Sequence, residues 1–384
     1  MTNDPSSAAA TGGGATTEAI SEDEIATVRK MIGEKLRIHQ WVHEASIDTI
    51  RHYAHGLGDD NPLWCDEAYG AKSPHGSIVA PPTFPYAVWP AGVGCGFPAL
   101  QVFHAGGRWE IKRYIRLGER LTVDARLADI RKLKGKRAGV MLLQTGKVTY
   151  STTDGEVVAQ HESRSFRVPE PSGGEGLKYT PRAQVWTEAE LDEMEAEILA
   201  QTRQGAEPLY WDDVAVGDAV PSRLKGPLDI ATIVSYYAGN VGGNLSTDMQ
   251  VRNRHLCLRH PELAANNRPA EIQARRASYG AGHHDASSAA RSGMPGIYDN
   301  GWMRVGWVQQ MLTDWIGDHA MMTMLDVSIM LPNVVGDIVR FKGVVSGRRE
   351  GGLVEIDVWG ERQDGELSCK GSATVRLPIR TGRN

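Results

Sequence analysis

Residues 283–312, HHDASSAARSGMPGIYDNGWMRVGWVQQML, carry the pattern from which the fold can be worked out. Two adjacent histidines and an aspartate open a polar, alanine-rich segment, and a Gly-Met-Pro-Gly turn follows it. The Asp-Asn-Gly at 299–301 then leads into an apolar stretch of helical character. Two interpretations follow: a reactive histidine opposite a helix N-terminus, or a solvated loop that carries imidazoles.

The chain repeats one plan twice: a turn-rich loop, a helix-sized apolar segment and then long strand-like stretches. The corresponding segments are 58–89, 114–127 and 148–168 in the first half and 283–307, 331–345 and 356–378 in the second. A glycine-acid turn leads the first strand of each half at Gly118 and Gly336, and an Asp-Gly-Glu turn splits the last two strands at Gly155 and Gly365. Asp-Gly between strand-like runs predicts tight antiparallel pairing. A helix followed by an antiparallel meander predicts the α+β class.

Composition limits the class of protein. The 384 residues suffice for two cores, and 41% hydrophobic with 23% charged residues is typical of a soluble globular protein. A net charge of −5 gives no electrostatic reason to expect nucleic acid or an anionic membrane as partner. The four cysteines are scattered without a CxxC pair, which argues against a zinc knuckle and fits a reducing compartment. With neither a secretory signal nor a membrane-length apolar run, we expect a cytoplasmic protein.

The composition also changes along the chain and divides it into segments. We expect a disordered tail over 1–21, an N-terminal unit over 22–169, a linker with an acidic helix over 170–207, and a C-terminal unit over 208–380. Thr187 and Glu190 form a capping box that predicts the start of the acidic helix. An Arg-, His- and Asn-rich segment, at about 239–281, is interpreted as an insertion over the site.

Four segments resemble the MaoC-like hydratases, the hot-dog family that contains (R)-specific enoyl-CoA hydratases and fatty-acid-synthase-type dehydratase domains. They are DDNPLWCDEAYG (59–70), HAGGRWEIKRYIRLGERL (104–121), GPLDIATIVSYYAG (226–239) and HHDASSAARSGMPGIYDNG (283–301). The resemblance covers most of residues 25–380. It implies a double hot-dog, in which each of two units is a long central helix wrapped by a curved antiparallel sheet. It also implies an acyl tunnel between the units.

The resemblance implies a hydratase or dehydratase that needs no cofactor. Adding water to a 2-enoyl thioester requires a base for the water that attacks C3 and an acid that protonates C2. Negative charge builds on the thioester oxygen, so a backbone N–H directed at that oxygen lowers the barrier. A glycine at a helix start offers such a donor without a side chain in the way.

Alignment of Asp66 with Asp285 compares the two loops at an offset of 219 residues. Trp64 then falls opposite His283, and Pro82 falls opposite Gly301. An indole is no general base and proline has no N–H, so we expect the first half to have lost its catalysis. Asp59 and Asn61 would remain as vestiges that line one wall of the acyl tunnel.

The second half keeps three of the family's groups. His283 is assigned as general base and acid, Gly301 as oxyanion donor, and Asp285 as orienting carboxylate, and His283 precedes Gly301 by the family's eighteen residues. The family's dyad aspartate should lie five residues before the histidine, where this chain has Ser278. The open candidates for the missing partner are Asp285, Asn244, Asp248 and Asp299. His284 and Asn244 are held as reserve catalytic residues.

Three aromatic residues are candidates for acyl binding: Tyr236, Tyr237 and Trp302. Aromatic residues at helical spacing also pack cores, so that alternative stays open. A metal at His283 and His284 is the rival to acid-base chemistry, but no HxxxH or cysteine partner lies nearby, and we expect no metal. The basic run at 131–137 could bind the phosphates of CoA or form a solvated hairpin turn.

The sequence thus predicts an acyl-CoA hydratase or dehydratase of fatty acid metabolism. Its substrate would be an acyl-CoA or carrier-protein thioester, with a preference for long or bulky acyl groups, and two double hot-dogs could form a homodimer. Two alternatives remain: a non-catalytic acyl-CoA-binding subunit of a hot-dog hetero-complex, and a hot-dog thioesterase.

Overall fold

The structure is a computed structural model. It describes residues 20–38, 40–97, 100–135, 139–169, 186–240, 248, 251–252, 255, 259 and 281–380. The predicted tail over 1–21 and the predicted insertion over 239–281 therefore lie mostly outside the described residues, as does the linker before residue 186. The division of the chain at 170–207 stays a proposal.

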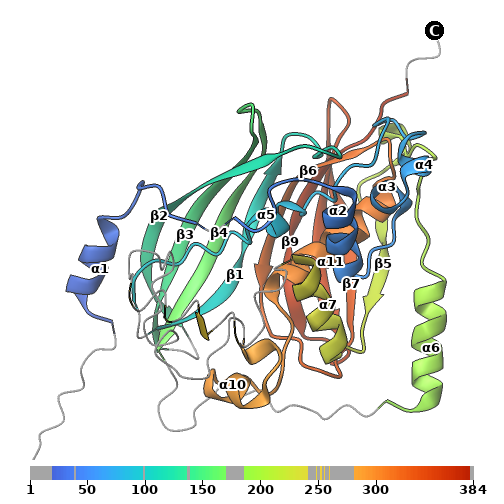
Figure 1. Ribbon diagram of the computed structural model, residues 1–384. Coiled ribbons are helices and arrows are strands. Elements are labelled where there is room, and N and C mark those ends of the chain that lie inside the picture. Colours follow the sequence, from blue (N-terminus) through green and yellow to red (C-terminus); the bar gives the residue numbers. More distant parts are fainter. Residues whose placement is uncertain are drawn as a thin grey trace, which may run out of the picture.

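The described residues form one antiparallel sheet of nine strands (Figure 1), in the order β2-β3-β4-β1-β6-β9-β8-β7-β5. The first half supplies β1 Leu100–Ile111, β2 Leu121–Gly135, β3 Gly139–Thr152 and β4 Val157–Pro169. The second half supplies β5 Ala219–Lys225, β6 Met321–Ile329, β7 Val339–Arg349, β8 Leu353–Arg362 and β9 Leu367–Arg376. The predicted α+β class, with an antiparallel sheet, is confirmed.

The two halves join where β1 pairs with β6, residues 106–110 running antiparallel to 324–328. Gly106 opens this seam with a φ of 110°, a conformation that favours glycine. A β-carbon there would also overlap the Val327 carbonyl oxygen. The seam thus depends on this glycine.

The two Asp-Gly turns form the predicted hairpins. Gly155 and Gly365 have φ values of 92° and 80°, as tight turns require. The turns connect β3 to β4 and β8 to β9, which pair antiparallel.

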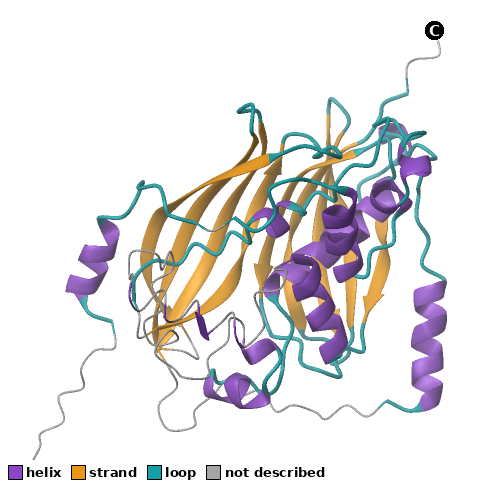
Figure 2. Ribbon diagram, viewed as in Figure 1, coloured by secondary structure: helices purple, strands orange, loops and turns teal. Residues whose placement is uncertain are grey.

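Helix α11 (Gly301–Ile316) is the predicted long helix of the second unit. Nearly all of its residues are buried, and it packs against β1, β5, β6, β7 and β8. In Figure 2 most of the helices, α11 among them, lie over the half of the sheet that contains β6 to β9. A helix buried on all sides needs partners for its polar residues, and Gln309, for example, accepts from the Thr83 hydroxyl of the first unit at 2.8 Å.

Among its described residues the first unit has no helix equivalent to α11, which corrects the expectation of a long central helix in each unit. Its counterpart α5 spans only Pro85–Val88. Pro90 follows closely, and a residue before proline is driven from helical to extended backbone. Trp89 accordingly has φ −161° and ψ 129°. Pro82, which the alignment set opposite Gly301, lies in a turn before α5 and not at its start.

Helices α2 (Ile47–Gly56) and α7 (Ile230–Asn240) cross at their C-terminal ends through equivalent glycines. A β-carbon at Gly56 would lie 3.0 Å from the Ser235 carbonyl oxygen, and one at Gly239 would overlap the His52 carbonyl oxygen. This near-symmetric contact brings the two units into direct backbone contact.

The remaining helices are short or lie at the edges of the sheet. They are α1 Glu22–Arg29, α3 Pro62–Cys65, α4 Glu67–Gly70, α6 Glu188–Leu199, α10 Ala286–Arg291 and the single 3-10 turns Trp211–Asp213 and Ala281–His283. The predicted capping box at the start of α6 is confirmed, because the Thr187 hydroxyl accepts from Glu190 N and the Glu190 carboxylate binds back. Among the described helices, none is long and apolar enough to cross a membrane.

Candidate active site

The N-terminus of α11 is the centre of the candidate site. Asn300 caps the helix: its side-chain oxygen accepts from Trp302 N at 2.8 Å. The next residue, Gly301, is partly exposed, and no acceptor for its N–H is found among the described residues. The helix dipole adds partial positive charge at this end. An oxygen that becomes negative would be stabilised here.

A buried ion pair stabilises the start of α11. Arg304 donates to both carboxylate oxygens of Asp299, at 2.7 and 2.5 Å, and both side chains are almost fully buried. Arg304 also donates to the backbone carbonyls of Leu331 and Ser368, at 2.6 and 2.9 Å. A buried charge pair is stable only with such additional partners. Together these bonds hold residue 299, and thus the start of α11, in one position.

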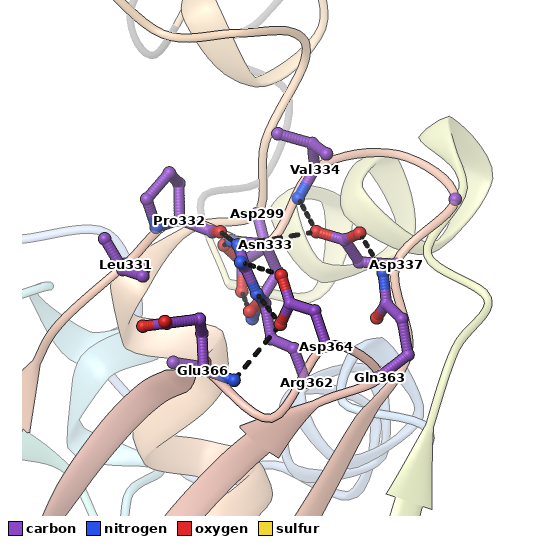
Figure 3. A network of polar contacts seen from close by, with 12 residues as sticks. Asp299, Leu331, Pro332, Asn333, Val334, Asp337, Arg362, Gln363, Asp364 and Glu366 are labelled. Carbon is purple, nitrogen blue, oxygen red and sulfur yellow. Dashed lines mark hydrogen bonds and ion pairs between the residues drawn. The ribbon is translucent and has the colours of Figure 1, made fainter. Parts of the chain in front are cut away.

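The loop between β6 and β7 adds further hydrogen bonds next to this ion pair (Figure 3). Asn333 donates its side-chain amide to Asp299 at 2.6 Å and accepts from Asp299 N at 2.9 Å. Arg362 reaches the Pro332 carbonyl at 2.9 Å, and Asp337 accepts from Val334 N at 2.8 Å. These hydrogen bonds hold the loop against Asp299, directly before the start of α11.

His283 lies beside Tyr298, three residues before Gly301, with one nitrogen already bound. Its Nδ1 is 2.9 Å from the Tyr298 carbonyl oxygen, and its ring packs 4.4 Å from the ring of Tyr298. A carbonyl only accepts, so Nδ1 carries the proton and Nε2 keeps its lone pair. Burial lowers the pKa of His283 to about 4, with the Tyr298 carbonyl and Asp299 opposing that effect. The imidazole is therefore neutral at pH 7 and able to accept a proton at Nε2.

Tyr237, one of two adjacent tyrosines of α7, connects His283 to the helix cap. The ring of Tyr237 lies 5.9 Å from the ring of His283, and its hydroxyl accepts from the Asn300 side chain at 2.9 Å. Tyr236 is likewise buried, and its hydroxyl accepts from the Asn240 side chain at 2.8 Å. The structure thus gathers His283, Tyr237 and the start of α11 in one place, as a substrate site would require.

Asp285 has a different role from the orienting carboxylate that the sequence suggested. It is the N-cap of α10, and its Oδ1 accepts from Ser287 Oγ and Ser288 N, both at 2.7 Å. These hydrogen bonds lower its pKa to about 2. The residue that orients His283 through Nδ1 is Tyr298. His284 is half-buried, and burial lowers its pKa while Asp285 opposes the effect.

Of the other candidates for the missing dyad partner, the structure describes Asp248 and Asp299. Asn244 lies outside the described residues, and Asp248 is exposed. Asp299 is close enough to raise the pKa of His283 electrostatically, but Arg304 and Asn333 occupy its two oxygens. Asp299 therefore acts on His283 as a charge rather than as a hydrogen-bond partner.

Sequence reasoning missed Asn240. It was assigned to the start of the insertion, but it is the last residue of α7 and is fully buried, and no described residue donates to its side-chain oxygen. A buried amide oxygen without a donor is a site for water or a ligand group. In the sequence, the indication of its role is that Asn240 follows the pair Tyr236 and Tyr237 by about one helical turn.

The equivalent loop of the first unit is closed by its own hydrogen bonds. Asp59 accepts from the Trp64 indole N–H and from Asn61 N, each at 3.0 Å. Asn61 in turn accepts from Leu63 N at 3.0 Å as the cap of α3. Burial raises the pKa of Asp59, and the Asn61 N–H opposes this shift. Trp64, which the alignment sets opposite His283, thus binds the Asp59 carboxylate. A role of Asp59 and Asn61 in the wall of an acyl tunnel stays a proposal.

Trp302, the second residue of α11, is buried between the two units. Its ring lies 6.0 Å from that of Tyr86 and 5.6 Å from that of His104, both in the first half. The contact with His104, on β1, is one that the sequence did not suggest. Among the described residues, no three His, Cys, Asp or Glu side chains come together in an arrangement that could hold a metal ion.

Comparisons with known proteins agree with this architecture. Residues 30–161 match the family described as FAS1-like, dehydratase domain region. A UPF0336 protein of a Parafrankia species is 33% identical over 120 residues, which is 29% of this chain and 76% of that protein. A protein of Mycobacterium tuberculosis named 3-oxo-4,17-pregnadiene-20-carboxyl-CoA hydratase beta subunit is 32% identical over 98 residues, 26% of this chain and 73% of that protein.

Solved structures agree on the fold. A MaoC-like dehydratase superposes with a TM-score of 0.65 at 19% identity, covering 91% of this chain and 99% of that one. A MaoC-like dehydratase of Phytophthora capsici superposes with a TM-score of 0.51 at 14% identity, covering the same shares. The double hot-dog fold expected from the sequence is therefore confirmed, and in this chain the helix of the first unit is the short α5.

Proposed function

Because the chain belongs to the MaoC-like hydratase and dehydratase family, with a FAS1-like dehydratase region in its first half, we propose that it catalyses the reversible addition of water to a 2-enoyl thioester. The site is the junction of His283 with the N-terminus of α11. The thioester is carried by CoA or by a carrier protein.

In the hydration direction, His283 Nε2 takes a proton from water while the water oxygen bonds to C3 of the acyl group. The C2–C3 double bond becomes single, and the electron pair moves toward the thioester oxygen, which the Gly301 N–H stabilises. The proton then passes from His283 to C2, which restores the thioester carbonyl. Dehydration follows the same path in reverse.

The hydrogen bond between His283 Nδ1 and the Tyr298 carbonyl is the observation that carries this proposal. It selects the tautomer whose Nε2 is basic, and it ties that ring to a residue three positions before Gly301. A histidine in a solvated loop would need neither the backbone contact nor the two tyrosine neighbours.

The direct test is hydration of a 2-enoyl-CoA by the purified protein, followed through the absorbance of the conjugated thioester. We expect turnover by the wild type and a loss of about 10²-fold or more in kcat for His283→Ala. Asp285→Ser preserves a capping side chain for α10 and should keep kcat within about twofold. Equal activity of wild type and His283→Ala would contradict the assignment.

The name of the M. tuberculosis relative, a hydratase beta subunit, favours one second candidate: a subunit that binds acyl-CoA beside a catalytic partner. That protein would bind a CoA ester in calorimetry without turnover. A third class, the thioesterase, would release free CoA that a thiol reagent detects. Hydration by the isolated chain without CoA release would exclude both alternatives.

The acyl group is proposed to be long or bulky. The shortened α5 leaves the first unit without the long helix that the second unit has. The same relative is named for a polycyclic acyl-CoA, which is consistent with this preference. Comparing kcat/KM for a polycyclic and a short straight-chain 2-enoyl-CoA tests it, and a preference for the short chain would contradict it.

A further inference from the structure

His104 is the buried imidazole that the proposed mechanism leaves without a role. It lies on β1, at a bulge where the pairing with β4 shifts between His104 and Gly106. Both ring nitrogens are buried, and apart from a weak contact with the Gly106 backbone neither has a hydrogen-bond partner among the described residues. Buried polar atoms are nearly always bonded, so this ring requires a partner from outside the described residues. Bulges redirect side chains and are frequent next to active sites.

The nearest part of the second unit is the proposed oxyanion donor itself. A β-carbon built on Gly301 would lie 2.5 Å from His104 Nδ1. The imidazole therefore occupies the space that a side chain at position 301 would fill. The Trp302 ring, 5.6 Å away, covers the imidazole from the next position of α11. A side chain of the first unit thus completes the surroundings of a helix start in the second.

We propose that His104 donates an N–H to the thioester oxygen and so forms, with the Gly301 amide, a two-donor oxyanion site shared by both units. This inference rests on the proposed hydratase function and adds one catalytic residue to it. It also gives the degenerate first unit a chemical reason to be retained, since the site is incomplete without β1.

The charge state of His104 suits this role. Burial lowers its pKa to about 3, the positive charges of Arg304 and Arg164 add to the effect, and the contact with the Gly106 backbone opposes it. The ring is therefore neutral at pH 7, and a neutral imidazole has one N–H to donate. Neutral imidazoles can polarise a carbonyl without transferring their proton. In a site from which water is excluded, such a donor acts most strongly on charge that develops in the transition state.

Two substitutions at position 104 separate hydrogen bonding from packing. His104→Leu fills similar space without a donor, whereas His104→Asn keeps an amide N–H near the position of Nδ1. We expect His104→Leu to lower kcat by about 10²-fold with KM little changed, and His104→Asn to recover most of that loss. Tyr86→Phe removes a buried hydroxyl that binds His161 at 3.2 Å in the same aromatic cluster and should keep kcat within about twofold. If His104 only fills space, His104→Leu will have wild-type kcat.

A spectroscopic measurement tests the same hydrogen bond without turnover. A conjugated aryl-enoyl-CoA, 4-(dimethylamino)cinnamoyl-CoA, absorbs at longer wavelength when its carbonyl is polarised. Bound to His283→Ala, it should show this red shift. The double variant with His104→Leu should bind it with a reduced shift, and the one with His104→Asn should retain the shift.

The outcomes distinguish the two proposals. An undiminished shift in the double variant with His104→Leu overturns the role of His104 and leaves the hydratase proposal standing. Binding with a His104-dependent shift but no hydration by the wild type supports the donor and overturns the hydratase. If the wild-type protein binds no acyl-CoA thioester, both proposals fail, because no thioester oxygen reaches the site.

Discussion

At the scale of single residues, the candidate site depends on which polar atoms are already bound. The Tyr298 carbonyl holds His283 Nδ1, and α10 holds the Asp285 carboxylate. His104 has both nitrogens buried without partners of normal geometry among the described residues. Among the described residues, the groups that we propose to act on the thioester are therefore His283 Nε2, the Gly301 amide and His104.

The pH dependence of activity follows from the burial of His283. Burial lowers its pKa from 6.5 to about 4, so the basic form persists well below neutral pH. If His283 is the general base, the acid limb of kcat/KM should fall near pH 4. The profile should be measured with a 2-enoyl-CoA, with circular dichroism at each pH to detect unfolding. A limb between about pH 6 and 7 in the folded protein would contradict this prediction.

The lowered pKa of His283 also affects the free energy of unfolding. The folded pKa lies below the unfolded value, so the unfolded chain binds the proton first as the pH falls. Above the unfolded value neither state is protonated and His283 has no effect. Its burial therefore destabilises the fold progressively as the pH falls from about 6.5 toward about 4.

At the scale of secondary-structure elements, the crossing of α2 and α7 positions the tyrosine pair. Gly56 and Gly239 allow the two backbones to touch, and Tyr236 and Tyr237 lie within the last turn of α7 before Asn240. Separation of the helices would shift Tyr237 relative to Asn300, its hydrogen-bond donor. The crossing thus controls the geometry of the site from outside it.

Alanine at the two glycines should have unequal effects. Elsewhere in a helix, Gly→Ala stabilises by about 0.5–1 kcal/mol. Gly239→Ala overlaps the His52 carbonyl and should destabilise by about 1–3 kcal/mol in urea unfolding. Gly56→Ala, with its nearest atom at 3.0 Å, should cost less.

Gly296→Ala is the matched control for the α2–α7 crossing. A β-carbon at Gly296 would meet nothing within 4 Å, so the unfolding free energy should change little. If Gly239→Ala is as stable as the wild type, the helices do not cross in this way.

At the scale of the whole molecule, the two units form one folding unit. One nine-stranded sheet crosses both, and one hydrophobic cluster contains residues from both. Arg164 of β4 and Asp326 of β6 form an ion pair across the seam. We therefore expect a single cooperative unfolding transition.

Gly106→Ala tests the seam. Its φ of 110° and the overlap with Val327 should both destabilise the variant. Gly155→Ala is the matched control, since its φ of 92° imposes a comparable backbone cost of about 1–3 kcal/mol with open space around it. Thermal unfolding followed by fluorescence and by circular dichroism should show one transition, with the larger loss for Gly106→Ala. Two separate transitions, or equal losses, would contradict a shared seam.

Much of the fold could be predicted because its signals are local. The Asp-Gly turns at 155 and 365 require positive φ, and the capping box at Thr187 begins a helix through its own side chains. The shortened first helix was also within reach of the sequence, since Pro90 disfavours helical backbone at Trp89. The resemblance to a known family then indicated how these elements assemble.

The sequence by itself determined the repeated α+β plan, the hairpins, and the pairing of a histidine with a glycine eighteen residues later. Only the tertiary structure decided which groups surround them. It bound Asp285 to α10, gave His283 a backbone carbonyl as partner, and brought His104 from the other half of the chain to Gly301. The physical reason is that turns and caps are formed by neighbours in sequence, whereas burial and hydrogen-bond partners arise from strands and helices that meet only when the chain is folded.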